Sequence, residues 1–295
     1  MKKSMMLFST RRPLRVLTMN IWGFTEPYAA RARLLREGIR RLDPDLMAFQ
    51  EAGFTRGRHQ VAELLDGLGY HVLHQFDHGA SRGSSDGNCV ASRWPMKLAE
   101  MRSLRLTPHS RDYPYVALGV KVAAPEPAGP LLFVNAKPSW QLTTEREREL
   151  QAVALARMVA RHSSVVGFPP ILAGDFDATP DSASIRFLTG KQSLSGMSVC
   201  YGDAWEQGGD GTEGHTWTWR NRFVRPNLDL WRVGRKHARR IDYIFLGWPR
   251  YFKRFARVRR CRVELSRPTN GIWPSDNFAV YAEIDSVAPS QPHSS

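Results

Sequence analysis

The sequence predicts an α/β protein in which two mixed β-sheets are covered by helices. Short apolar runs typical of strands occur along the whole 295-residue chain. Amphipathic helical patterns separate some of these runs, and turn-forming residues separate others. Helical crossovers allow parallel pairing, whereas tight hairpins join antiparallel strands. A pair of mixed sheets therefore fits the pattern better than a simple doubly wound sheet.

The first half of the chain is predicted to alternate strands with two helices. Residues 14–20 alternate apolar and polar residues, which indicates a strand. Residues 28–42 place their leucines on one face of a basic amphipathic helix, and Asp43-Pro44 ends it. The run 46–49 predicts a buried strand that leads into Gln50 and Glu51. We then expect a helix near 60–68, strands near 70–75, 89–92 and 98, and a surface loop at 77–88.

The second half is predicted to be richer in strands. A Thr144-x-x-Glu147 capping box opens a helix that continues to about Arg161. A short buried strand at 171–173 ends at Gly174, and Asp181 or Ser182 is placed to cap a following helix. The other expected strands lie at 115–122, 131–135, 241–246 and 278–284.

Neither an internal repeat nor a central linker is visible, so the sequence predicts a single domain over residues 14–286. Residues 1–13 are then an N-terminal extension, and the Pro/Ser-rich tail at 287–295 is expected to be disordered. No apolar run approaches the roughly 20 residues that a transmembrane helix needs. The three cysteines are far apart and form no CxxC pair, which favours reduced thiols in the cytoplasm over a zinc site.

The formal net charge of +14 is unusual for a globular protein of this size. It suggests a polyanionic partner such as nucleic acid, a phosphate-bearing substrate or a membrane surface, although solubility alone also explains it. Between Arg220 and Arg262 there are fifteen Lys or Arg residues and two acids. In residues 250–257 aromatic residues alternate with cations. That pattern suits a phosphate backbone with stacked bases, and equally suits a charged edge strand.

Polar side chains stand at the ends of several predicted strands. Asp175 and Asp177 follow the strand at 171–173 and, being two residues apart, point to the same side. Clustered carboxylates on a rigid strand end are costly unless they bind a cation or share a proton. Such an oxygen-rich group suits a hard cation, Mg²⁺ or Mn²⁺. The strand-end residues are Asn20, Glu51, Asp175, Asp177, Asp242 and Asp276.

Six segments carry these residues in a characteristic order. They read LTMNIWG at 17–23, PDLMAFQE at 44–51, GNCVASRWP at 87–95, AGDFDATPDS at 173–182, RRIDYIFLG at 239–247 and PSDNFAVYAEI at 274–284. Together they resemble the endonuclease/exonuclease/phosphatase superfamily, which includes DNase I-like nucleases, abasic-site endonucleases, sphingomyelinases and inositol-phosphate phosphatases. The resemblance covers residues 14 to 285. It implies a four-layer α/β sandwich and metal-assisted phosphoester hydrolysis.

The resemblance also implies a metal site. Asn20 and Glu51 match the ligands on the metal side, and Asp276 matches a possible further ligand. The implied cofactor is Mg²⁺ or Mn²⁺. A cation there offsets charge on the phosphoryl oxygens while a carboxylate prepares water for in-line attack.

The remaining matches imply groups that act on water and phosphate. Asp175 resembles the carboxylate that orients or deprotonates the attacking water. Asp177 fills a position, usually Asn in the family, that helps to hold the phosphate and the nucleophile. Asp242 resembles the acid that orients a histidine, and Asp276 the acid beside that histidine.

Two departures from the family pattern affect the expected activity. The last motif ends in Asn277 where the family has histidine. A second family histidine follows the strand at 131–134. It best fits Ala136, with Lys137 as the alternative register. Asn277 can donate a hydrogen bond to a phosphoryl oxygen, but its amide does not titrate and cannot carry a positive charge. With asparagine at this position, Asp242 has no imidazole to orient.

We therefore expect a divalent-metal phosphoesterase whose phosphodiester hydrolysis is slow or absent because of Ala136 and Asn277. Loss of a positioned acid or base costs roughly 10²–10⁴ in rate. Two alternatives remain: a non-hydrolytic protein that binds phosphate or nucleic acid, and a phosphatase or lyase that acts on a small or lipid phosphoester. The substitutions have two possible origins. One is deliberate inactivation of an active parent, and the other is a natural non-hydrolytic branch of the family. The sequence gives no oligomeric state.

Overall fold

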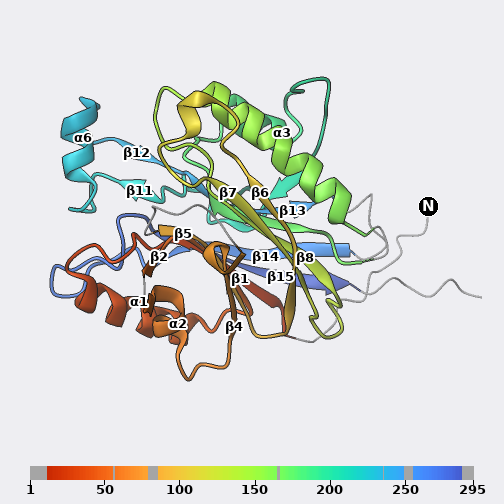
Figure 1. Ribbon diagram of the computed structural model, residues 1–295, viewed down its shortest axis with the longest axis horizontal. Coiled ribbons are helices and arrows are strands. Elements are labelled where there is room, and N and C mark those ends of the chain that lie inside the picture. The colour runs from red at the N-terminus through yellow and green to blue at the C-terminus, as the bar shows by residue number, and fades with distance from the viewer. Residues whose placement is uncertain are drawn as a thin grey trace, which may run out of the picture.

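The protein is described from a computed structural model that covers residues 12–55, 57–78, 86–164, 167–234, 236–248 and 255–287. Two large sheets form its centre (Figure 1). In the first sheet only β1 and β2 run parallel, and the short β3 (Arg58–His59) pairs with β2. Its strand order is β14 (Phe255–Glu264), β15 (Ala279–Val287), β1 (Leu14–Asn20), β2 (Leu46–Thr55), β5 (Asp86–Ser92) and β4 (His71–His74).

The second sheet has one parallel pair, β8 and β9, among antiparallel strands. Its order is β10 (Tyr201–Asp203), β13 (Asp242–Gly247), β9 (Ile171–Asp175), β8 (Leu131–Ala136), β7 (Val116–Val122) and β6 (Met96–Ser103). A separate two-stranded ribbon joins β11 (Trp217–Thr218) to β12 (Ala238–Arg239). Both large sheets are therefore mixed, as the sequence predicts.

Helices cover the outer faces of the two sheets, with α1 and α2 on the first and α3 on the second (Figure 1). Residues of α4 belong to the same apolar cluster as those of α3. The inner faces meet in a third apolar cluster that contains residues from strands of both sheets. This arrangement confirms the expected four-layer α/β sandwich. The helices are α1 (Tyr28–Leu42), α2 (Gln60–Leu65), α3 (Glu145–His162), α4 (Ala183–Leu188), α5 (Ala204–Gly208) and α6 (Arg225–Trp231), with 3₁₀ turns at Gln75–His78 and Pro108–Ser110.

Side-chain alternation along the strands divides inner from outer residues. On β8, Leu131 and Phe133 lie in the cluster between the sheets, whereas Leu132 and Val134 face the layer that contains α3. Asn135 continues the inner series, and its amide donates to backbone carbonyls of the first sheet at 2.8 and 2.9 Å. The inner positions at the ends of the strands therefore hold polar groups that connect the two sheets.

The predicted capping box at the start of α3 is wrong, although the helix begins where expected. Thr144 is the N-cap residue, but its side chain caps no backbone N–H. Its hydroxyl donates to the carbonyl of Gln141 at 2.8 Å, and Glu147 accepts from Thr107 at 3.2 Å. Both side chains therefore have other partners.

Several expected segments fall partly outside the described residues. These include 1–11, 79–85, 250–254 and 288–295. Residues 86–88, expected in a loop, begin β5, and Phe255 begins β14, which is an edge strand.

Cys89, Cys200 and Cys261 form no disulfide, and the cytoplasmic location inferred from them stays a prediction. No helix within the described ranges is long and apolar enough to cross a membrane.

Gly174 is required where β9 approaches β8. Its φ is 158°, and an added Cβ would lie 2.0 Å from the carbonyl oxygen of Ala136. We expect Gly174→Ala to lower the free energy of unfolding by roughly 3–5 kcal/mol, because strain and overlap add. Urea denaturation measures this, with Gly234→Ala as the control, since an added Cβ there meets nothing within 4 Å. An equal loss of unfolding free energy in Gly174→Ala and Gly234→Ala would contradict the close approach of Gly174 to Ala136.

Candidate active site

Seven of the eight predicted site residues lie together where strands of both sheets end, at one end of the space between them. Asn20, Asp175 and Asp242 share the inner alternation of Val16, Ala173 and Ile244. Hydrogen bonds and ion pairs then connect strands far apart in the sequence. The seven residues are Asn20, Glu51, Asp175, Asp177, Asp242, Asp276 and Asn277.

Glu51 belongs to an irregular part of β2. The pairing of β2 with β5 shifts register between Phe49 and Ala52, and Glu51 has a φ of 49°. Asn20 Nδ2 donates to Glu51 Oε1 at 2.8 Å and to Asp175 Oδ2 at 3.0 Å. The amide oxygen of Asn20 accepts the backbone N–H of Trp22 at 3.0 Å. Asn20 therefore positions two carboxylates, and its own oxygen is engaged elsewhere.

Lys137 follows β8, and its ammonium lies among the carboxylates. Nζ donates to Asp175 Oδ2 at 2.7 Å, pairs with Asp177 and lies 3.6 Å from Glu51 Oε1. Only 3% of the side chain is exposed. Burial acts to lower the pKa of Lys137, but the charges of the three carboxylates outweigh burial and raise the pKa well above its usual value. Lys137 is therefore a permanent cation of the site.

The register that placed Ala136 in the site is wrong. Ala136 is fully buried in the apolar cluster between the second sheet and α3. Because side chains alternate along a strand, position 137 shares the inner face of Phe133 and Asn135. Lys137, the residue of the alternative register, is the one whose side chain contacts the carboxylates.

Asp177 is fixed by its backbone as well as by Lys137. Its φ is 50°, a conformation that few non-glycine residues adopt. Its N–H donates to Asp175 Oδ1 at 3.2 Å, and its carbonyl accepts from Arg239 Nη2 at 2.5 Å. The sequence assigned Arg239 no function beyond the basic region.

Asn277 bridges two of the acids. Its amide nitrogen donates to Asp242 Oδ2 at 3.0 Å and lies 3.4 Å from Asp175 Oδ2.

Thr216 holds the start of β13. Its hydroxyl oxygen accepts the backbone N–H groups of Ile241 and Asp242 at 3.1 and 3.2 Å. Sequence reasoning missed Thr216, because a lone threonine in a loop carries no distinctive signal.

The acids repel one another in this buried setting. Burial and the charges of Glu51 and Asp175 raise the pKa of Asp276 to about 7. Burial and the charge of Asp175 raise the pKa of Asp177 to about 6, against the opposing effect of Lys137. Burial and the same neighbour raise the pKa of Asp242 well above its usual value. The cluster therefore favours protons or cations, as the sequence predicts for grouped carboxylates.

The chemistry of the donors bears on a divalent cation. Within the described part of the chain, no three Asp, Glu, His or Cys side chains are arranged to hold a metal ion. Mg²⁺ is commonly bound by one or two carboxylates, with waters and substrate phosphates completing its octahedron. The carboxylates of Glu51 and Asp276 are donors of this kind, whereas the side-chain oxygen of Asn20 already accepts the N–H of Trp22.

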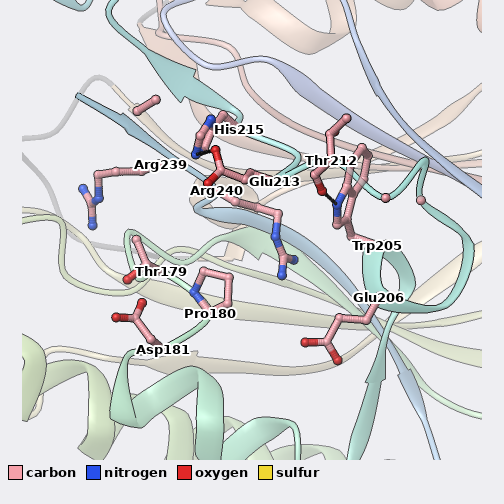
Figure 2. A pocket seen from close by; sticks show the side chains of 13 residues that line it. Thr179, Pro180, Asp181, Trp205, Glu206, Thr212, Glu213, His215, Arg239 and Arg240 are labelled. Atoms are coloured by element: carbon pink, nitrogen blue, oxygen red, sulfur yellow. Dashed lines mark hydrogen bonds and ion pairs between the residues drawn. The ribbon is translucent and has the colours of Figure 1, made fainter. Parts of the chain in front are cut away.

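A cavity of about 610 Å³ is lined by Thr179, Pro180 and Asp181, which follow Asp177 in the sequence (Figure 2). Arg239, which also holds the carbonyl of Asp177, is part of its wall. His215 lines the same cavity, and its Nε2 lies 3.3 Å from the carboxylate of Glu213. Trp205 is in the wall too, where its indole N–H donates to the carbonyl of Thr212 at 3.0 Å.

Other tryptophans stack on one another. Trp140 and Trp231 lie 6.0 Å apart between ring centroids, and Trp231 and Trp217 lie 5.3 Å apart. Trp217 and Trp273 are buried, so packing accounts for them.

Comparisons with known proteins agree with this fold. A sequence profile described as the Endonuclease/Exonuclease/phosphatase family matches residues 17–276. A humanized zebrafish (D. rerio) TDP2 is 17% identical with a TM-score of 0.67, covering 92% of this chain and 98% of that one. Zebrafish TDP2 complexed with a single-strand DNA product is 18% identical with a TM-score of 0.66 and the same coverage.

The human Nocturnin catalytic domain with bound sulfate anion is 20% identical with a TM-score of 0.64, covering 95% of this chain and 97% of that one. At these identities the structural likeness establishes the fold alone. Curated protein sequences provide no match to this chain.

Proposed function

Because the chain belongs to the Endonuclease/Exonuclease/phosphatase family, we propose that it hydrolyses a phosphoester by attack of water on phosphorus. The observation that carries this proposal is the setting of Asp175, whose side chain is 2% exposed. Its Oδ2 lies within 3.4 Å of nitrogen donors on Asn20, Lys137 and Asn277, and its Oδ1 accepts one backbone N–H. Oδ1 therefore retains a lone pair for a water molecule.

In the proposed reaction Asp175 orients the water and takes its proton. The water oxygen forms a bond to phosphorus while the bond from phosphorus to the leaving oxygen breaks. The leaving oxygen takes a proton from solvent, and Asp175 returns its proton to solvent. Asn277 holds Asp242 and lies beside Asp175, but its amide cannot act as an acid or a base, so we expect slow turnover.

Glu51 and Asp276 would hold Mg²⁺ or Mn²⁺. When bound, the ion would supply positive charge to the phosphoryl oxygens. Asn20 would act by positioning Glu51, because its oxygen already accepts the N–H of Trp22.

Nucleic acid is the substrate class that the charge favours. The net charge of +14 suits a polyanion, and single-strand DNA is the product named for the similar zebrafish TDP2 structure. We propose DNA or RNA phosphodiesters as the first substrates to test, followed by a generic aryl phosphodiester and an inositol phosphate. Hydrolysis of any of these in excess Mg²⁺, and none after chelation, is the expected result. No hydrolysis in any metal condition would contradict the proposal.

Glu51→Ala is expected to weaken Mg²⁺ binding by at least about tenfold, or about 1.4 kcal/mol, because one of two carboxylate ligands is lost. Calorimetry on the metal-free protein measures this without relying on activity. Glu213→Ala is the control, since the side chain of Glu213 is 83% exposed. Equal affinities for the Glu51→Ala variant and the unchanged protein would remove Glu51 from the metal site.

A non-hydrolytic phosphate-binding function is the second candidate. The observation that favours it is the contact of 2.7 Å between Lys137 Nζ and Asp175 Oδ2, because it engages Asp175 as the partner of a cation. Phosphate binding without turnover on any of the substrates above would support it.

A further inference from the structure

Arg31, on α1, is a fully buried charge outside the carboxylate cluster. Burial lowers the pKa of Arg31 to about 10, so the guanidinium stays charged at neutral pH. Among the residues that the structure describes, its side-chain hydrogen bonds all go to backbone carbonyl oxygens, and its Nε has no hydrogen-bond partner. Burying such a charge is unfavourable, and an arginine that only filled space would direct its guanidinium to solvent. The position of Arg31 therefore needs a reason other than packing.

The carbonyl groups that Arg31 holds belong to residues 21–23, which follow β1. Its Nη2 donates to the carbonyls of Ile21 at 2.8 Å and Trp22 at 3.2 Å, and lies 3.4 Å from that of Gly23. The segment is strained, because Trp22 has a φ of 54°, a rare conformation for a bulky side chain. Such a conformation persists only where its surroundings fix it. Arg31 is one of the groups that fix it, and its guanidinium carbon lies 5.1 Å from the centre of the Trp22 ring.

The same segment sets the direction of the Asn20 side-chain amide. The backbone N–H of Trp22 donates to Asn20 Oδ1 at 3.0 Å. With its oxygen held there, Asn20 directs Nδ2 to Glu51 Oε1 at 2.8 Å and to Asp175 Oδ2 at 3.0 Å. An amide turned the other way would present its oxygen to two carboxylates, which only accept hydrogen bonds when ionised. The bond from Trp22 therefore decides which end of Asn20 faces the acids.

We propose that Arg31 is a positioning residue that keeps the side-chain amide of Asn20 turned toward the carboxylates. It does so by holding residues 21–23, and its own guanidinium touches neither substrate nor cation. This rests on the proposed phosphoester function, in which Glu51 holds the cation and Asp175 holds the water. Partners that orient such groups from behind typically change metal affinity or activity by 10–100-fold when they are replaced.

The test separates this role from a general effect on stability. Four proteins are compared: the unchanged protein, Arg31→Lys, Asn20→Ala and the double variant Arg31→Lys with Asn20→Ala. Lysine keeps the charge but lacks the planar fork that reaches several carbonyls at once. Arg36→Lys is the matched control, because Arg36 also lies on α1 and donates to two backbone carbonyls at 2.7 Å. Those carbonyls belong to Leu64 and Asp66, which have no part in the site.

The measurements are hydrogen exchange of the Asn20 side-chain amide by NMR in the metal-free protein, calorimetry with Mg²⁺, and kcat on an aryl phosphodiester in excess Mg²⁺. The amide signal is the one that Asn20→Ala lacks. Arg31→Lys should speed its exchange at least about tenfold. It should also weaken Mg²⁺ affinity and lower kcat by roughly 10–100-fold. The double variant should bind Mg²⁺ no more weakly than Asn20→Ala, since Arg31 acts through Asn20. Arg36→Lys should match the unchanged protein in all three measurements.

Unchanged exchange of the Asn20 amide in Arg31→Lys would overturn the proposal, whatever metal or substrate the protein binds. Additive losses of Mg²⁺ affinity in the double variant would overturn it too, because Arg31 would then act by another route. One such route is the bond from the N–H of Gly23 to the carbonyl of Glu51 at 2.7 Å. An equal effect of Arg36→Lys would show that Arg31 serves only the stability of α1.

Gln60→Met is the second variant, to be used if Arg31→Lys does not fold. Gln60 Nε2 donates to the carbonyl of Gly23 at 2.7 Å and so holds the same segment. Faster exchange of the Asn20 amide is again the expected result, and unchanged exchange the contrary one.

The failure of this inference is distinguishable from the failure of the proposed function. Faster exchange of the Asn20 amide in Arg31→Lys, with no turnover of any phosphoester by the unchanged protein, would support the inference and contradict the hydrolytic function. Turnover by the unchanged protein, with unchanged exchange in Arg31→Lys, would support the hydrolytic function and overturn the inference.

Discussion

Asp175→Asn is expected to lower phosphoester turnover by roughly 10²–10⁴-fold, because an amide has no basic oxygen to take the proton of the attacking water. The side chain keeps its size, and Asp177 still pairs with Lys137. The free energy of unfolding should therefore change by no more than about 2 kcal/mol. Initial rates on the best substrate, in excess Mg²⁺, measure the effect.

Asp66→Asn is the control for this substitution, since Asp66 is exposed at the end of α2. Its turnover should equal that of the unchanged protein. If Asp175→Asn also keeps full turnover, Asp175 does not act on the water, and the assignment of the base fails.

Asn277→His is expected to raise turnover by roughly 10²–10⁴-fold. The amide of Asn277 already lies 3.0 Å from Asp242 Oδ2. An imidazole in its place would donate one ring N–H to Asp242, which fixes the tautomer and leaves the other ring nitrogen for proton transfer. The measurement is kcat on an aryl phosphodiester at fixed Mg²⁺.

Asn277→Gln controls for the change of size, because an amide carries no proton to transfer. Turnover of the Asn277→His variant should exceed that of the Asn277→Gln variant by roughly 10²–10⁴-fold. Equal rates for the two variants would show that the missing imidazole does not limit the reaction.

The layered fold was predictable because most elements satisfy local rules. The amphipathic pattern of residues 28–42 and the Asp43-Pro44 stop predict a helix, and α1 has these same bounds. The segment with β11, α6 and β12 was not predicted. Its strands are two residues long and, among the residues that the structure describes, pair with each other alone, so no repeating pattern marks them.

The site was predictable where alternation along a strand determines it. Asp175 and Asp242 continue the inner series of Ala173 and Ile244. The same rule, applied to Leu131 and Phe133, points to position 137 rather than 136.

Other features depend on geometry that alternation does not contain. Glu51 lies at an irregularity of β2 with a positive φ, which a run of apolar letters does not reveal. The pairing of Lys137 with Asp177 joins two segments through tertiary contact alone. The sequence alone therefore does not predict that Lys137 and Asp177 contact each other.

The most direct measurement of the central claim is hydrolysis of a phosphodiester in ¹⁸O-labelled water with excess Mg²⁺. If Asp175 directs water to phosphorus, the label should appear in the phosphate product of the unchanged protein, and Asp175→Asn should yield almost none of that product. Label in the released alcohol, or equal product from both proteins, would contradict the account.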